Sequence, residues 1–179
     1  MSEQDEAIEA TRRWIERAVI GLGLCPFARK PFEQDGVRIA LSDARDTDAL
    51  LQALSDELTH LANSSPTTCE TTLLVHPHVL QDFLDFNDFL DLADACVEAM
   101  GLTGEIQVAS FHPHYQFADS DADDIANATN RSPFPTLHLL REASVSRAVD
   151  SLADPDAIYQ RNIAQLRALG WDGLRKALG

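Results

Sequence analysis

Short strand-like runs alternate with long amphipathic stretches over the first 110 residues, and this alternation limits the folds open to the chain. Residues 37–41 and 105–111 alternate in polarity as half-buried strands do, and residues 71–75 form the apolar run of a buried strand. Apolar side chains recur at helical spacing over residues 5–22, 47–61 and 81–100. A helix therefore precedes each of the three strands.

The rest of the chain adds a long loop, a fourth strand at residues 136–140 and helices near the C-terminal end. Asp154 fits an N-cap, Pro155 the first helical position and Gly170 the position after a helix end. This order predicts an α/β or α+β fold, with residues 1–179 in a single layered domain and a mixed sheet of about four strands flanked by helices. We expect parallel pairing among the first three strands.

The charge of the chain excludes two classes of partner. Its formal net charge is -15, and the segment from Asp46 to Asn130 contains 16 Asp and Glu but no Lys or Arg. Nucleic acids and anionic membranes bind clusters of Lys and Arg, so neither is expected as a partner. Solvated acidic faces on two central helices account for most of the excess. Basic residues return at Arg131, inside the long loop.

The N-terminal sequence and the cysteines indicate a compartment. MSEQDEAIEATRRW is acidic and polar, unlike the basic and then apolar start of a signal peptide, and no apolar run is long enough to span a membrane. The three cysteines are too few and too scattered for a disulfide framework. A cytoplasmic protein with reduced thiols is expected.

The segment FHPHYQFADSDADDIANATNRSPFPTLHLLRE, residues 111–142, holds the most unusual group of polar side chains. Its loop covers roughly residues 112–135, and a loop of this length is usually either functional or disordered. Aromatic residues and prolines are frequent in it, which argues against disorder. We therefore predict one long ordered loop.

A divalent metal site is one interpretation of this loop. His112 and His114 share a face of an extended segment, and His138 or the aspartates would complete the ligand set. A calcium-binding loop is excluded, because its sixth position falls on Asp124 rather than glycine and its twelfth on Asn130 rather than glutamate. The alternative is that one of the aspartates caps a short helix while the others are solvated.

An anion-binding pocket is the second interpretation. Arg131 with Asn127 and Asn130 would hold a polar or anionic ligand, and Arg29 and Arg141 would add charge-assisted hydrogen bonds. No glycine-rich phosphate loop accompanies these residues, so nothing indicates a nucleotide. The alternative is that the Asn and Arg side chains bond the carbonyl groups of the loop itself, as a long ordered loop requires.

Nucleophilic catalysis by Cys25 is the third interpretation. Cys25 precedes a short basic segment that would lower a thiol pKa. His112 or His138 would activate the thiol or act as a general acid or base. Free cysteines are more often small buried hydrophobic residues, so this alternative stays open too. We interpret Trp14 and Trp171 as core or helix-contact residues.

Three segments together resemble the bacterial family called domain of unknown function 1415: RRWIERAVIGLGLCPFAR, LLVHPHVLQDFLDFNDFLDLAD and FHPHYQFADSDADDIANATNRSPFPTLHLLREASV. The resemblance covers most of the chain and implies no reaction. It implies instead that certain positions belong together: Cys25, Pro26 and Phe27; His76 and Asn87; His112 and Pro113; Asn127, Asn130 and Arg131; His138, Arg141 and Glu142.

We therefore predict a cytoplasmic protein with an enzyme-like pocket for a small polar or anionic molecule. The pocket would form where the long loop, the fourth strand and the Cys25 turn converge. The competing hypothesis is a non-enzymatic domain that binds a metal or a protein partner through the His- and Asp-rich segment or the acidic face.

Overall fold

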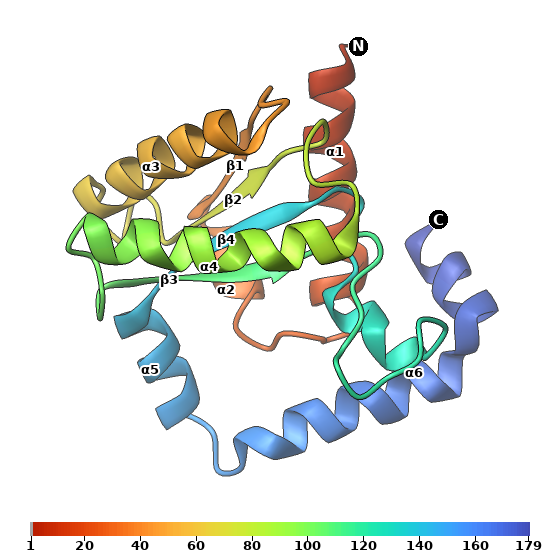
Figure 1. The fold of residues 1–179 in the computed structure, drawn as a ribbon. Coiled ribbons are helices and arrows are strands. Elements are labelled where there is room, and N and C mark those ends of the chain that lie inside the picture. The colour runs from red at the N-terminus through yellow and green to blue at the C-terminus, as the bar shows by residue number, and fades with distance from the viewer. Residues whose placement is uncertain (1) are drawn as a thin grey trace.

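A computed structural model describes residues 2–179, which form a four-stranded mixed sheet with helices on both faces (Figure 1). The strands are β1 (Val37–Leu41), β2 (Thr71–Val75), β3 (Ile106–Phe111) and β4 (Thr136–Arg141). Their order is β1-β2-β4-β3, with β1 and β2 parallel and β4 antiparallel to both of its neighbours. The predicted fold class and the mixed sheet are confirmed.

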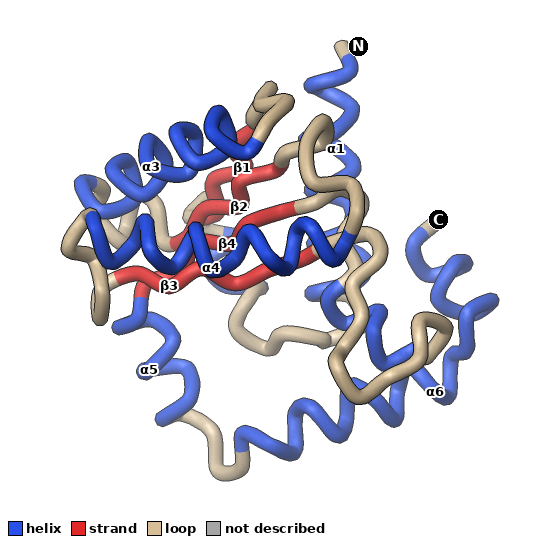
Figure 2. Tube along the Cα trace, viewed as in Figure 1, coloured by secondary structure: helices blue, strands red, loops and turns tan. Residues whose placement is uncertain are grey.

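The helical segments lie in front of the sheet, behind it and below it in the view of Figure 2. They are α1 (Glu3–Trp14), continued by the π-helical turn η1 (Ile15–Ile20), α2 (Arg29–Glu33), α3 (Thr47–Asn63), α4 (Phe83–Ala99), the 3-10 helix η2 (Ile125–Asn130), α5 (Glu142–Asp150) and α6 (Pro155–Leu178). Side chains of Ser2, Asp46, Asp82 and Asp154 accept hydrogen bonds from the first turns of α1, α3, α4 and α6. These caps satisfy backbone donors that a helix leaves unpaired and fix where each helix begins.

The prediction of parallel pairing among the first three strands is correct for β1 and β2. It is wrong for β3, which pairs antiparallel with β4. β4 lies between β2 and β3, so that His138 pairs with Leu73 on one side and with Ala109 on the other. Leu137 and Leu139 of β4 are fully buried, whereas most of β3 is only half-buried. Burial of apolar β4 side chains therefore favours the central position for β4 and leaves β3 at the edge.

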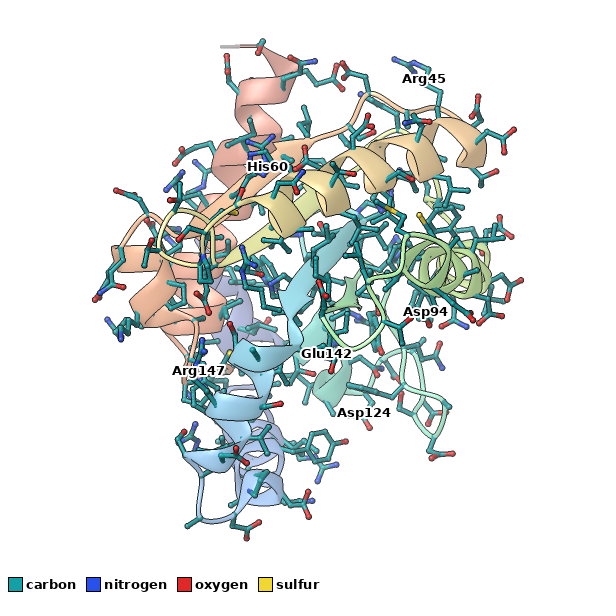
Figure 3. All side chains as sticks on the ribbon, turned by 90° about the vertical axis from the view of Figure 1, so that its left-hand side faces the viewer. Arg45, His60, Asp94, Asp124, Glu142 and Arg147 are labelled. Carbon is teal, nitrogen blue, oxygen red and sulfur yellow. The ribbon has the colours of Figure 1, made fainter. Side chains whose placement is uncertain are left out.

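α3 and α4 cover one face of the sheet and enclose the largest apolar core (Figure 1). Leu54 of α3, Phe86 of α4 and Leu137 of β4 are fully buried in it. The outward side of α4 carries exposed aspartates, among them Asp94, which Figure 3 labels. This side of the molecule holds the acidic face that the charge distribution predicts.

α1 and η1 pack against the opposite face of the sheet. Trp14, Ile15 and Leu73 are buried there in a second apolar cluster, and the rings of Trp14 and Phe111 meet edge to face at 5.0 Å between centroids. Such a contact adds to the stabilisation that burial of the two rings provides. The face opposite α3 and α4 therefore has its own apolar core.

α6 bends at Gly170, whose φ of 65° and ψ of 173° interrupt the helix. A helix end at Gly170 is therefore confirmed, although the chain resumes a helix directly after it. Beyond the bend, Leu174 packs with Leu166 and with Ala128 of η2 in a third buried cluster. This contact brings the C-terminal residues against the long loop.

Among residues 2–179, no helix combines the length and the apolar character that a membrane crossing requires.

Candidate functional site

The Asn127 side chain is bonded entirely within the long loop. It is fully buried, its Oδ1 accepts from the Phe117 backbone N–H at 2.9 Å and from Ser120 Oγ at 2.8 Å, and its Nδ2 donates to the Asp121 carbonyl at 2.8 Å. Asp124 caps η2 by accepting from a backbone N–H at 2.9 Å. Both side chains thus bond backbone groups of the loop. This matches the two structural alternatives, in which Asn side chains bond the loop backbone and an aspartate caps a short helix.

Arg131 is also anchored to the loop, although part of its guanidinium remains available. Its Nε donates to the Tyr115 carbonyl at 2.9 Å and its Nη2 to the Ala122 carbonyl at 2.6 Å. The guanidinium carbon lies 5.5 Å from the centroid of the Trp171 ring, which is cation–π range. Burial lowers the pKa of Arg131. Nearby, Asn130 Nδ2 donates to the Ser110 carbonyl at 3.3 Å.

His112 is buried beside α4 with both ring nitrogens bonded. Its Nδ1 accepts from the His114 backbone N–H at 3.0 Å, so its Nε2 is the nitrogen that donates to the Leu80 carbonyl, also at 3.0 Å. Desolvation lowers the pKa of His112, and the neutral ring fits these two bonds. His112 therefore ties the start of the long loop to the connection between β2 and α4.

The two His-Pro-His sequences meet at one edge of the sheet because β2 and β3 point in the same direction. The ring of His76 stacks on Phe86 at 5.7 Å between centroids, and the ring of His112 lies 5.0 Å from the same Phe86. His76 Nδ1 bonds the Val79 carbonyl at 3.1 Å, while its buried Nε2 has no partner within residues 2–179. Desolvation lowers the pKa of His76 to about 4.

His138 lies on the other face of the sheet. Thr71 Oγ1 donates to the Leu139 carbonyl at 2.6 Å, so it accepts from His138 Nε2, which is 2.8 Å away. The ring of His138 also lies 5.7 Å from the ring of Phe111. Desolvation lowers the pKa of His138 to about 4. The sheet therefore separates His138 from His112. The predicted metal ligands His112, His114 and His138 are for this reason not brought together.

The other predicted residues are dispersed as well. Cys25 lies half-buried in the turn after η1, and Arg29 pairs with Glu33 at 3.4 Å on exposed α2. Arg141 Nη2 donates to the carbonyls of Leu61, Ser64 and Cys69 at 2.8–3.0 Å, which ties β4 to the end of α3. In the part of the chain that the structure describes, no three His, Cys, Asp or Glu side chains are grouped to hold a metal ion.

A cavity of about 330 Å³ lies where α1 and η1, the end of the long loop and the C-terminal part of α6 meet. Three arginines line it, namely Arg13, Arg131 and Arg175, and we name it the arginine cavity. Its walls include the rings of Trp14 and Trp171 and several small or aliphatic side chains. Neither Cys25 nor His112 nor His138 lines this cavity.

The lining of the arginine cavity contains no Asp or Glu, although acidic residues outnumber basic ones two to one in the chain. Arg175 pairs with Asp172, which is exposed beside it. Arg13 is exposed, and it has no ion pair or side-chain hydrogen bond within residues 2–179. Arg13 and the free edge of Arg131 therefore offer donors that the protein itself leaves unused.

Arg131, which lines this cavity, was predicted from the sequence as a ligand-binding residue, whereas Arg13 and Arg175 were not. One signal was present: Arg13 directly precedes Trp14, and Arg175 follows Trp171 by four residues, on the same side of a helix. The interpretation of Trp14 as a core residue is correct, since its exposed fraction is 6%. Its ring nevertheless forms part of the cavity wall.

The sequence model of the family described as "Protein of unknown function (DUF1415)" matches residues 6–176. Neither a curated protein nor a solved structure matches the chain.

Proposed function

Because the chain belongs to the DUF1415 family, whose description assigns no activity, we propose its function from the arginine cavity: it binds a small amphipathic organic anion. The carboxylate or other anionic group of the ligand lies at the mouth, between Arg13 and Arg131. The apolar body of the ligand lies against the tryptophan rings and the aliphatic side chains inside.

The distribution of polarity in the cavity supports this orientation. Arg13 and Arg175 are exposed, whereas Trp14, Ala18 and Leu174 are buried. A ligand with an anionic head and an apolar body matches this gradient, because its head stays hydrated while its body leaves water. The volume of about 330 Å³ lies at the lower end of the range for small-molecule sites, which favours a short body.

The single observation that carries the proposal is the gathering of three arginines around two tryptophans in a chain of net charge -15. A purely structural role leaves the hydrogen-bonding capacity of Arg13 unexplained, because its side chain makes no ion pair or side-chain hydrogen bond within residues 2–179. Guanidinium groups bind carboxylates through paired hydrogen bonds, and they do so more strongly where apolar walls exclude water.

Tryptophan fluorescence tests the proposal directly, because both tryptophans of the chain line the arginine cavity. We expect octanoate and phenylacetate to change the emission on titration, and acetate to bind far more weakly because it lacks an apolar body. The variant Arg13→Ala should weaken binding about tenfold or more, since a charge-assisted hydrogen bond contributes about 1.5–3 kcal/mol and about 1.4 kcal/mol is tenfold in Kd.

Arg167→Ala is the matched control. Arg167 is exposed on α6, outside the cavity, so its loss removes one charge without touching the site. Equal weakening by the two variants would show a diffuse charge effect and contradict the proposal, as would octanoate and phenylacetate binding no more tightly than acetate.

A further inference from the structure

A second cavity, of about 660 Å³, lies between α2, α5 and the connection from α3 to β2. Its two basic side chains are Lys30 of α2 and Arg147 of α5, and we name it the Lys30 cavity. Figure 3 shows Arg147 on the opposite side of the molecule from Asp94 and the acidic outer side of α4. The two cavities share no lining residue.

One wall of the Lys30 cavity is a bonded group of three side chains. Ser144 Oγ donates to Glu70 Oε1, and Arg147 Nη2 lies 3.8 Å from the same Oε1 and 3.3 Å from Ser144 Oγ. The Glu70 side chain is 23% exposed, so its carboxylate is held in place at the wall rather than extended into solvent. This group also ties the first turn of α5 to the sheet.

Several groups of this cavity have no partner within residues 2–179. They are the ammonium group of Lys30, the side-chain amide of Gln34 and the second carboxylate oxygen of Glu70. The ammonium group of Lys30 donates hydrogen bonds, the oxygen of Glu70 accepts them, and the amide of Gln34 does both. A bound molecule that satisfies all three carries both acceptors and donors of hydrogen bonds. An anionic group suits the charge of Lys30, and hydroxyl groups suit Gln34 and Glu70.

The remaining walls are rigid and moderately apolar. Pro26, Phe27, Pro31 and Pro66 contribute them. A proline ring loses little conformational freedom on binding, and an aromatic face packs well against the C–H groups of a sugar ring. With Lys30 and Arg147 against Glu70, the lining carries one net positive charge, which suits a ligand with a single anionic group.

We propose that the Lys30 cavity binds a small polyhydroxylated anion of the sugar-acid or sugar-phosphate class. Lys30 and Arg147 hold the carboxylate or phosphate, Glu70 and Gln34 bond the hydroxyl groups, and Phe27 packs against the carbon skeleton. This site differs from the arginine cavity in its chemistry, because its lining supplies acceptors for hydroxyl donors as well as cations.

Isothermal titration calorimetry with gluconate and glucose 6-phosphate tests this site. We expect at least one of them to bind, and the one that binds identifies the anionic group as carboxylate or phosphate. Glucose, which lacks the charge, and inorganic phosphate, which lacks the carbon skeleton, should bind at least tenfold more weakly. Lys30→Gln should weaken binding of the sugar anion about tenfold, because Lys30 has no structural partner and its loss leaves the fold intact.

Two controls separate this inference from the proposed function. Arg45→Gln removes one positive charge at a position remote from Arg147 (Figure 3), and it should leave the affinity unchanged. Arg13→Ala should also leave it unchanged, whereas it weakens binding in the arginine cavity. The inference is overturned if neither sugar anion binds, if inorganic phosphate binds equally well, or if Arg45→Gln has the same effect as Lys30→Gln.

Discussion

At the scale of single residues, the polar side chains of the long loop hold the loop in one conformation. Asn127, Arg131 and His112 bond backbone groups that would otherwise be unpaired. Arg131 does this with two of its nitrogens, its Nη1 has no hydrogen-bond partner within residues 2–179, and its side chain lines the arginine cavity. Arg131 can therefore both stabilise the loop and bind a ligand, because its two hydrogen bonds to loop carbonyls hold the rest of the guanidinium in a fixed position.

Asn127→Ala should lower the free energy of unfolding by about 3 kcal/mol or more. The change leaves the Phe117 N–H and the Asp121 carbonyl without their partner, and each unpaired buried group costs about 1–3 kcal/mol. Urea denaturation measures the effect, with Asn87→Ala as control because Asn87 is exposed on α4. If both variants are equally stable, Asn127 does not lock the loop.

The residue types of the site could be predicted from the sequence, but their partners could not. An Asn or Arg in a long loop donates equally well to a ligand or to a carbonyl of that loop, and only the folded geometry decides between them. The predicted catalytic group of Cys25, His112 and His138 requires that all three side chains reach one cavity. The sheet instead places the two histidines on opposite faces. Arg13 lies about 120 residues from Arg131, so no local pattern relates them.

At the scale of elements, strands β1 and β2 could be predicted to the residue, because residues 37–41 alternate in polarity and residues 71–75 form an apolar run too short for a helix. The order of the sheet could not, because β4 inserts between β2 and β3 after a loop of more than twenty residues. Periodicity describes which side of an element is buried, and it does not describe which neighbour buries it.

The bend at Gly170 positions one wall of the arginine cavity. Its φ of 65° with ψ of 173° is a conformation that only glycine adopts readily, so Gly170→Ala should cost about 1–3 kcal/mol. We expect the C-terminal segment to detach in part and Trp171 to become more solvated, which a red shift of the tryptophan emission would detect. Binding of octanoate should weaken with it.

Gly173→Ala provides the control for this bend. Gly173 lies within the helix after the bend, and an added methyl group comes within 3.3 Å of the Leu169 side chain, which must shift slightly. Alanine is a better helix former than glycine by about 1 kcal/mol, which offsets this crowding, so the variant should be close to the wild type in stability. A Gly170→Ala protein with unchanged emission and affinity would show that the bend does not position Trp171.

At the scale of the whole molecule, positive and negative charge are separated. The outer side of α4 carries exposed aspartates, while three basic residues line the arginine cavity and two line the Lys30 cavity. The chain has no Lys or Arg between Asp46 and Asn130, so this separation follows from the order of the elements along the sequence. An anion approaching the molecule is repelled on one side and attracted at the cavities.

Two histidines on opposite faces of the sheet make the stability of the whole molecule depend on pH. Desolvation lowers the pKa of both His76 and His138 to about 4, against about 6.5 for an unfolded histidine. Between these values the unfolded chain binds protons that the folded chain does not bind, so stability falls as the pH drops from 6.5 towards 4. For His76, which is fully buried, the loss across the window is about 3 kcal/mol.

Urea denaturation at pH 7, 5.5 and 4.5 measures this loss, and NMR titration of the histidine ring protons should show both rings still neutral at pH 5. His76→Gln removes one of these groups, so its free energy of unfolding should change less between pH 6.5 and 4.5, even if the variant is less stable at pH 7. His60→Gln is the control, because His60 is exposed on α3 and its ring has no side-chain hydrogen bond within residues 2–179. A His76→Gln protein with the same pH dependence as the wild type would show that burial of His76 does not exclude its proton. The loss at low pH would then arise from other groups.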